Sequence, residues 1–252
     1  MDDFDLAGSV AIVTGGNGGI GRGIALGLAK AGADVALAAR NEAKLAETKA
    51  EIEALGRACL AVSCDVTKRA DIETTIERTR EALGVPTILV NNAGIGRAGR
   101  PEDLAESDWD AVLDVNLKAC FVFAQAMFPS MKEAGHGKVI NIGSEYSLFG
   151  SPRVVSYSAS KGGVIQLTKS LAVAWAPENI QVNCIIPGWI WTDMTVGIKD
   201  RQDFYDHIIG RTPAGRFGEP EELGGAAVFL ASKASDFVTG VSIPVDGGFA
   251  VM

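Results

Sequence analysis

The sequence has little of what nucleic-acid-binding, metal-binding and membrane proteins need. Its 252 residues carry 23 Lys and Arg against 31 Asp and Glu, a formal net charge of −8. A phosphate-binding surface needs an excess of basic side chains, so we expect no nucleic-acid partner. Only 2 His and 4 Cys are present, without paired metal-ligand spacing, so no metal site is expected. No apolar run approaches the ~20 residues that cross a bilayer, so we expect no membrane segment.

Cysteine usage and the N-terminal segment both favour the reducing interior of a cell. Most of the cysteines lie in apolar, β-like stretches, where cysteine usually behaves as a small buried hydrophobe. The first residues read Met-Asp-Asp-Phe-Asp and lack the basic and apolar regions of a signal peptide. We therefore expect a cytoplasmic protein.

Short β-like runs alternate with longer amphipathic runs along the chain, which is typical of βαβ units. The predicted strands are 9–14, 35–39, 59–63, 87–90, 139–142, 180–186 and 241–245. The predicted helices are 20–31, 42–55, 69–83, 109–133, 156–175 and 221–230. This order predicts an α/β fold, a Rossmann-like doubly wound parallel sheet of about seven strands with helices on both faces.

The chain shows no linker, internal repeat or low-complexity tract. Residues 1–252 are therefore expected to form a single dinucleotide-binding and catalytic domain. Residues 189–217 are rich in Trp, Pro and Gly and lack a regular hydrophobic period. A long irregular segment inside a compact domain is typical of an active-site lid, so we predict a substrate lid at about 189–217.

A glycine-rich loop, Thr14 to Gly21, lies between the first predicted strand and helix. Bare Cα positions let a backbone approach a pyrophosphate, and a helix N-terminus offers free N–H groups to it. The spacing is Gly-x-x-x-Gly-x-Gly, and a plain strand-to-helix turn would need glycines too. The candidate phosphate contacts are Gly15, Asn17, Gly19, Ile20 and Gly21.

The end of the second predicted strand bears on the choice of cofactor. NAD-specific sites often place Asp or Glu there to bind the adenosine ribose 2′-hydroxyl. Here Ala39 is followed by Arg40, which leaves room and a counter-charge for a 2′-phosphate. We therefore predict that NADP(H) is favoured, with NAD(H) still possible, although Arg40 would also suit the solvent-exposed end of a strand.

Four polar residues carry the candidate chemistry. Tyr157 and Lys161 are four residues apart in a predicted helix, so their side chains share one face. A neighbouring ammonium stabilises a phenolate, which makes Tyr157 a candidate general acid and base for ketone reduction and alcohol oxidation. Ser144 follows a predicted strand and would hold the substrate oxygen. Asn116 sits inside a long predicted helix, where asparagine is disfavoured, so it lies either at a buried kink or on a tolerant surface.

Taken together, these motifs resemble the short-chain dehydrogenase/reductase family, in its single-domain form of about this length. The resemblance covers nearly the whole chain. The motifs that carry it are Thr14–Gly21, Asp65, Asn91–Gly94, Asn116, Ser144, Tyr157-x-x-x-Lys161, Pro187–Gly188, Thr192 and Asp246–Gly248.

The resemblance implies a role for each matching residue. Asn116, Ser144, Tyr157 and Lys161 would form a catalytic tetrad, with Lys161 also on the nicotinamide ribose and Asn116 holding a water. The remaining implied cofactor contacts are Asp65 and Val66 at the adenine, Asn92, Ala93 and Gly94 along the inner edge, and Pro187, Gly188, Ile190 and Thr192 at the carboxamide. The resemblance also implies an oligomer, which we expect to be a homotetramer.

Two branches of the family compete for the substrate. The phrases at 213–218 and 229–236 look like those of sugar-acid and polyol dehydrogenases. The 3-oxoacyl-carrier-protein reductases also resemble the chain, but they dock an acidic carrier on basic residues, and Glu178 has the wrong sign for that partner. Lys132, Lys138 and Arg153 keep this alternative open. A non-catalytic cofactor-binding regulator is a further alternative, which a complete tetrad disfavours.

Four residues near the predicted reaction centre are candidate pocket residues alongside Ser144. They are Glu145, Tyr146, Trp189 and Trp191. Aromatic side chains pack against sugar or alicyclic ring faces, although the tryptophans would also suit the lid's own small core. A charged Glu145 would bind hydroxyls and repel a carboxylate, which counts modestly against a sugar acid. The substrate, its stereochemistry and the physiological direction stay open.

Overall fold

The computed structural model describes residues 2–252 and contains one parallel sheet in the order β3-β2-β1-β4-β5-β6-β7. The strands are β1 (Val10–Thr14), β2 (Asp34–Ala39), β3 (Cys59–Ser63), β4 (Ile88–Asn91), β5 (Gly137–Ile142), β6 (Ile180–Pro187) and β7 (Ser242–Val245). The strand order reverses between β1 and β4, which is the point where such sheets bind ligands at the carboxyl ends of the strands. The predicted doubly wound parallel sheet of seven strands is confirmed.

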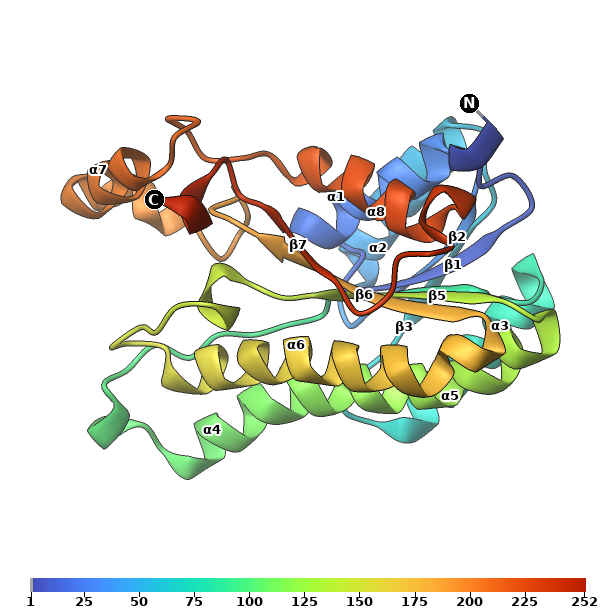
Figure 1. Ribbon diagram of the computed structural model, residues 1–252, viewed down its shortest axis with the longest axis horizontal. Helices are drawn as coiled ribbons and strands as arrows, with labels where there is room; N and C mark the ends of the chain where they lie inside the picture. The colour runs from blue at the N-terminus through green and yellow to red at the C-terminus, as the bar shows by residue number, and fades with distance from the viewer. Residues whose placement is uncertain (1) are drawn as a thin grey trace.

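Helices cover both faces of the sheet (Figure 1). They are α1 (Gly19–Lys30), α2 (Glu42–Ala54), α3 (Arg69–Leu83), α4 (Glu106–Leu113), α5 (Ala119–Ala134), α6 (Val155–Trp175), α7 (Gln202–Arg211) and α8 (Gly224–Ala231). Helices α1, α2 and α8 lie on one face, and α3, α5 and α6 lie on the other. The predicted elements agree with these bounds to within about three residues, apart from α7 and one interruption described below.

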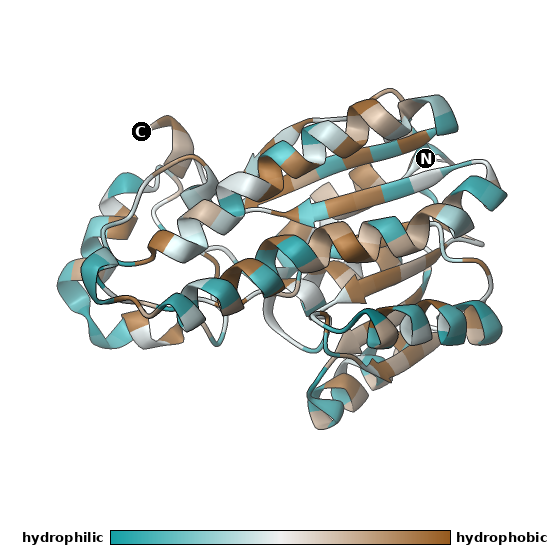
Figure 2. Cartoon of the chain, turned by 90° about the horizontal axis from the view of Figure 1, so that it is seen from below, coloured by the Kyte–Doolittle hydropathy of each residue, from teal (hydrophilic) through white to brown (hydrophobic). Residues whose placement is uncertain are grey.

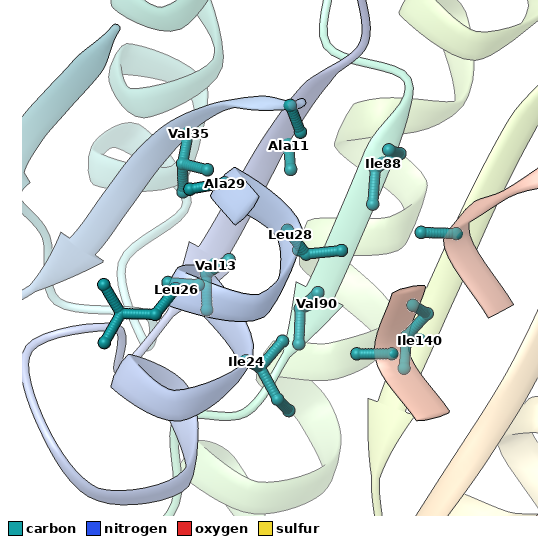
Figure 3. Close-up of a cluster of buried hydrophobic side chains, with 14 of the residues drawn as sticks. Ala11, Val13, Ile24, Leu26, Leu28, Ala29, Val35, Ile88, Val90 and Ile140 are labelled. Atoms are coloured by element: carbon teal, nitrogen blue, oxygen red, sulfur yellow. The ribbon is translucent and has the colours of Figure 1, made fainter. Parts of the chain in front are cut away.

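Successive side chains of each strand point to opposite faces of the sheet and pack against the two helical layers. Ala11 and Val13 point toward α1, where they pack with Ile24 and Leu28 (Figure 3). Ile12, between them, belongs to the cluster on the opposite face. Figure 2 shows the same arrangement, with hydrophobic residues concentrated along the strands. The buried aliphatic layers hold the strands in register, and so fix the loops at their carboxyl ends.

The helix predicted at 109–133 starts earlier and contains an irregular turn. It begins as α4 at Glu106, passes through a π-turn at Asp114–Lys118 and continues as α5. By length and composition this stretch could cross a membrane. No membrane segment is expected from the sequence, because charged residues at both ends of this stretch keep its apolar run short. Its buried side chains pack against the sheet, which identifies it as a core helix of the domain.

The segment predicted to be irregular, 189–217, contains a helix, so that part of the prediction is wrong. Helix α7 spans Gln202–Arg211, and a shorter 3₁₀ helix at Val196–Asp200 precedes it. Ile208 and Ile209 of α7 pack with aromatic residues of the same segment. The segment thus builds a small core of its own, and the flanking Trp, Pro and Gly residues hide its short helical period. In Figure 1, α7 stands beyond one end of the sheet, next to the C-terminus.

Candidate active site

The loop between β1 and α1 is tied to the end of β4 by hydrogen bonds. The Thr14 hydroxyl accepts from the backbone N–H groups of Asn92 (2.9 Å) and Ala93 (3.0 Å). The Asn92 side-chain amide donates to the carbonyls of Thr14 (2.9 Å) and Gly15 (3.2 Å). Asn92, expected to line the cofactor, therefore uses its amide N–H groups to hold the loop. The shape of the loop is set by the chain itself.

Two glycines of this loop lie in different surroundings. A Cβ on Gly21 would lie 2.2 Å from the carbonyl oxygen of Gly15, so only glycine fits there. A Cβ on Gly18 would meet nothing within 4 Å, and Gly18 caps α1 without a side-chain hydrogen bond. The first N–H groups of α1 therefore receive no side-chain acceptor from the cap, an arrangement that suits a phosphate. Sequence reasoning missed Gly18, although its place directly before the helix marks it.

Arg40 and Asp65 lie close together at the ends of β2 and β3. Arg40 is exposed directly after β2. The Asp65 carboxylate accepts from both the N–H and the hydroxyl of Thr67, and the bond from the hydroxyl is the main cause that lowers the pKa of Asp65. Ala39 pairs with Ser63 in the sheet, so Arg40 and Asp65 leave neighbouring strand ends, and the charge of Arg40 lowers the pKa of Asp65 slightly further. Val66, next in the chain, is buried.

Asn116 lies in the π-turn of the long helix and is fully buried. Its amide accepts from the backbone N–H of Ile95 (2.8 Å) and donates to the Ile95 carbonyl (2.9 Å). It also donates to the Ser160 hydroxyl (3.1 Å), which in turn donates to the carbonyl of Tyr157 (2.7 Å). The buried-kink alternative is the one observed. The side chain joins the loop after β4 to the first turns of α6.

Lys161 and Tyr157 occupy one face of α6 at the carboxyl end of β5. Lys161 is buried, and its ammonium donates to the carbonyl of Ile142 (2.7 Å). The same ammonium lies 5.7 Å from the centroid of the Tyr157 ring. A Cβ on Gly94 would lie 3.7 Å from this ammonium, so the loop after β4 also reaches the pair. The expected juxtaposition of amine and phenol is present.

Ser144 lies directly after β5 and faces the start of α6. Its hydroxyl accepts from the backbone N–H of Tyr146 (3.2 Å) and caps the short helix that begins at Glu145. The Ser147 hydroxyl accepts from the Ser144 N–H (3.1 Å) and donates to the carbonyl of Lys161 (2.9 Å). Ser147 therefore holds the serine loop against the helix that carries the tyrosine and lysine.

Glu145 is buried, with 5% of its surface exposed, and neither carboxyl oxygen has a hydrogen-bond partner among the described residues. Burial and, next, the nearby Asp246 carboxylate raise the pKa of Glu145 to about 8, while Arg211 acts in the opposite direction. At neutral pH the carboxyl is therefore mostly protonated. This buried carboxyl with a raised pKa differs from the charged Glu145 considered from the sequence, because sequence reasoning did not foresee the burial.

The two tryptophans differ in their surroundings. Trp191 stacks on Phe217, with ring centroids 4.1 Å apart, and belongs to the core of the segment that contains α7. Trp189 meets Tyr146 edge-on at 6.3 Å, and Tyr146 meets Tyr157 edge-on at 6.2 Å. The indole N–H of Trp189 is buried without a partner among the described residues. Both tryptophans therefore pack in the core of their own segment, and of the two only Trp189 also meets Tyr146, the neighbour of Tyr157.

The segment that follows β6 packs against the glycine-rich loop between β1 and α1. Pro187 ends β6, Gly188 follows it, and Ile190 is buried in the core. A Cβ on Gly19 would lie 3.1 Å from a methyl group of Thr192, so the predicted carboxamide segment faces the predicted phosphate loop. The residues expected around a dinucleotide thus occupy one continuous edge of the sheet.

Sequence reasoning also missed Arg211 and Asp246 as neighbours of this site. Arg211 ends α7, and Asp246 directly follows β7. Asp246 lies within the Asp-Gly-Gly motif, but nothing in the sequence pairs it with Glu145, a hundred residues away. Among the described residues, no group of three or more His, Cys, Asp or Glu side chains could hold a metal ion.

Comparisons with known proteins show which proteins the chain resembles over its whole length. Residues 15–250 match a family model described as enoyl-(acyl carrier protein) reductase. The chain is 42% identical over 250 residues to 2-dehydro-3-deoxy-D-gluconate 5-dehydrogenase of Dickeya dadantii, covering 99% of this chain and 98% of that one. It is 42% identical to the 5-keto-D-gluconate 5-reductase of Escherichia coli, with the same two shares. A solved gluconate 5-dehydrogenase from Burkholderia cenocepacia, in complex with NADP and tartrate, is 41% identical, with a TM-score of 0.95, covering 100% of this chain and 98% of that one.

Proposed function

The chain belongs to the short-chain dehydrogenase/reductase family, and from this premise we propose that it reduces the ketone of a sugar acid with NADPH, or oxidises the corresponding alcohol with NADP⁺. It is an oxidoreductase that interconverts a ketone and a secondary alcohol by hydride transfer. The observation that carries the proposal is the Tyr157–Lys161 pair, which lies beside Ser144 at the edge of the sheet that also holds the glycine loop.

NADP(H) is the favoured cofactor. The residues present fit it, because Gly18 leaves open space before α1 and Arg40 stands free at the end of β2. The N-terminus of α1 would bind the pyrophosphate. Arg40 would pair with the 2′-phosphate, and Asp65 with Val66 would contact the adenine. Lys161 would bind the nicotinamide ribose.

The proton of the reaction would come from Tyr157. NADPH supplies, when bound, the hydride that adds to the carbonyl carbon. The Tyr157 hydroxyl would give its proton to the carbonyl oxygen, so that a secondary alcohol forms and a phenolate remains. The buried ammonium of Lys161 would stabilise this phenolate. The Ser144 hydroxyl would donate to the same oxygen and stabilise the charge that develops on it.

Asn116 would act as a positioning residue. Both polar atoms of its amide are engaged, by Ile95 and by Ser160, so we do not assign it the expected water-holding role. Through Ser160 it holds the backbone of Tyr157, and through Ile95 it holds the loop after β4. Replacing it would therefore displace the tyrosine rather than remove a reacting group.

Two observations support a sugar acid over the acyl-chain alternative. The carboxyl of Glu145 is mostly neutral at pH 7, so it does not repel a substrate carboxylate. Lys132, which kept an acidic carrier protein possible, forms an ion pair with Glu178 (2.8 Å). The relatives reported above are named for gluconate-type substrates, which we extend to this chain as part of the proposal.

We further propose a homotetramer that works in the cytoplasm. Large apolar side chains are exposed on α5 (Phe121), on α6 (Val173) and after α8 (Phe237). Exposed apolar groups of this size support association with further copies of the chain. Residues 189–217, with the core around Trp191, would form the substrate lid.

The test compares initial rates of NADPH oxidation for wild type and Tyr157→Phe. The substrates are 5-keto-D-gluconate, a neutral cyclic ketone and an acetoacetyl thioester. We expect the keto acid to be the best substrate and the variant to lose about 10²–10⁴-fold in kcat with NADPH affinity retained. Tyr205→Phe, whose ring stacks on Phe217 in the core of the α7 segment, is the matched control and should keep most of its activity. Equal turnover by Tyr157→Phe would remove Tyr157 from the catalytic role. Binding of NADPH by wild type without turnover of any substrate would make the chain a cofactor-binding regulator, and a preference for the thioester would make it an acyl-chain reductase.

A further inference from the structure

Arg211, the last residue of α7, lies against two aromatic rings that meet each other edge-on, with centroids 6.3 Å apart. Its guanidinium carbon lies 4.7 Å from the ring centroid of Phe149 and 4.3 Å from that of Phe249. Phe149 follows the serine loop after β5, and Phe249 follows β7. Three separate segments thus converge on one guanidinium. Contact with two rings restrains the position of the group, and it uses none of the N–H donors of the guanidinium.

No carboxylate pairs with this guanidinium among the side chains that the structure describes. The next arginine along the chain, Arg216, shows the contrast, because it makes a two-fold contact with Glu222 (2.7 Å to each oxygen). Arg216 is largely exposed, whereas Arg211 is half-buried. A half-buried guanidinium without a protein carboxylate has its binding capacity free for a ligand.

Arg211 borders the proposed reaction centre. It lies near enough to Glu145, the residue after Ser144, to influence its pKa. A series of ring contacts also connects the two places. Phe249 contacts Trp189 (6.5 Å), Trp189 contacts Tyr146, and Tyr146 contacts Tyr157. A continuous series of aromatic contacts therefore connects Arg211 to Tyr157, and the buried Glu145 carboxyl lies close to Arg211.

We propose that Arg211 is a specificity-determining residue that binds the carboxylate of the substrate while the ketone lies at Tyr157. This inference rests on the proposed function, a sugar-acid dehydrogenase. A planar guanidinium matches a carboxylate with two parallel N–H···O bonds, and partial burial strengthens such a pair. Because rings of several side chains separate the two groups, the carboxylate and the ketone belong at opposite ends of the substrate.

The alternative role for Arg211 is structural, in joining α7 to the C-terminal turn. A structural residue affects every substrate equally, whereas a carboxylate receptor affects only acids. The matched pair of substrates is 5-keto-D-gluconate and its uncharged C1 amide, which has the same shape and the same ketone. The ratio of their kcat/KM values isolates the recognition of charge.

The experiment measures this ratio in wild type, Arg211→Gln and Arg211→Lys, together with thermal unfolding and the Kd of NADPH. We expect Arg211→Gln to lower kcat/KM for the keto acid by about 10–150-fold, mainly through KM, and that for the amide by less than about threefold. Arg211→Lys keeps the charge and the ring contacts but loses the planar fork, so its value should lie between. Arg201→Gln is the control, since Arg201 also lies over a ring (Phe204, 4.9 Å) but is exposed.

Each outcome decides between the hypotheses. Equal losses for acid and amide in both variants, with a lower unfolding temperature, would show a structural role and overturn the inference. An unchanged preference for the acid in Arg211→Gln would overturn it too, while leaving the proposed function intact. A wild-type enzyme that prefers the amide to the keto acid would overturn the sugar-acid function and this inference together.

Discussion

The site has two halves, the loops after β1 and β4 and the loops after β5 and β6, and they differ in whether their buried polar groups have hydrogen-bond partners. After β1 and β4, the side chains and backbone of Thr14 and Asn92 satisfy one another in a closed set of hydrogen bonds. After β5 and β6, the carboxyl of Glu145 and the indole N–H of Trp189 are buried without hydrogen-bond partners among residues 2–252. Buried polar groups are normally paired, so the unpaired ones mark where a ligand or a proton supplies the missing partner. Under the proposed function, the first half would hold the cofactor in one fixed loop shape, and the second half would distinguish the substrate.

The largest expected effects come from two glycines of the first half. Gly21→Ala would place a methyl group 2.2 Å from the Gly15 carbonyl oxygen, and it should cost about 1–3 kcal/mol of stability or prevent folding. Gly18→Ala, with nothing within 4 Å, should unfold like wild type but weaken NADPH binding about tenfold or more. Thermal unfolding and NADPH titration of both variants separate the two roles. Normal NADPH affinity in a folded Gly18→Ala protein would contradict the assigned phosphate position.

The raised pKa of Glu145, in the second half of the site, predicts how the stability of the protein depends on pH. Its pKa is raised in the folded state, from an ordinary 4.5 to about 8, so the folded protein holds a proton that the unfolded chain has lost in this range. The stability linked to that proton is complete below about pH 4.5 and is lost as the pH rises through about 8, a change on the order of a few kcal/mol. Glu145→Gln cannot ionise, so its advantage in unfolding temperature over wild type should grow from pH 5 to pH 9. If the unfolding temperatures of wild type and Glu145→Gln changed in parallel with pH, the carboxyl would already have a partner. Glu73→Gln, at an exposed position, is the control.

A charge reversal at Arg40 shows whether the first half of the site alone sets the preference for NADPH over NADH. Arg40→Asp removes the counter-charge for a 2′-phosphate and introduces a carboxylate suited to a ribose hydroxyl. The ratio of NADPH to NADH affinity should fall about 100-fold, while the KM for the keto substrate at saturating cofactor stays within about twofold. Arg78→Asp makes the same change of charge at an exposed place on α3. An unchanged affinity ratio would remove Arg40 from the cofactor site.

The same contrast explains which parts of the molecule could be predicted from its sequence. Periodicity and glycine stops located the strands, and local motifs located Tyr157, Lys161 and Ser144, because those signals act over a few residues. The substrate half depends on segments that are far apart, such as Glu145 and Asp246, and no local pattern reports their meeting. Helix α7 was missed because its packing partners lie inside its own small cluster. The burial that neutralises Glu145 is likewise a tertiary property.

The smallest expected effect concerns the ion pair that connects the two halves. Lys44 of α2 pairs with Asp193 at the start of the proposed lid, and both side chains are largely exposed. Exposed pairs are screened by water and salt, so Lys44→Gln should change the unfolding temperature by no more than about 1 °C and kcat/KM by less than about twofold. Asp193→Asn is the matched variant, and measurements at low and high salt check the screening. A change of tenfold or more in kcat/KM would mean that this pair holds the lid over the cofactor, and the two halves would then act as one unit.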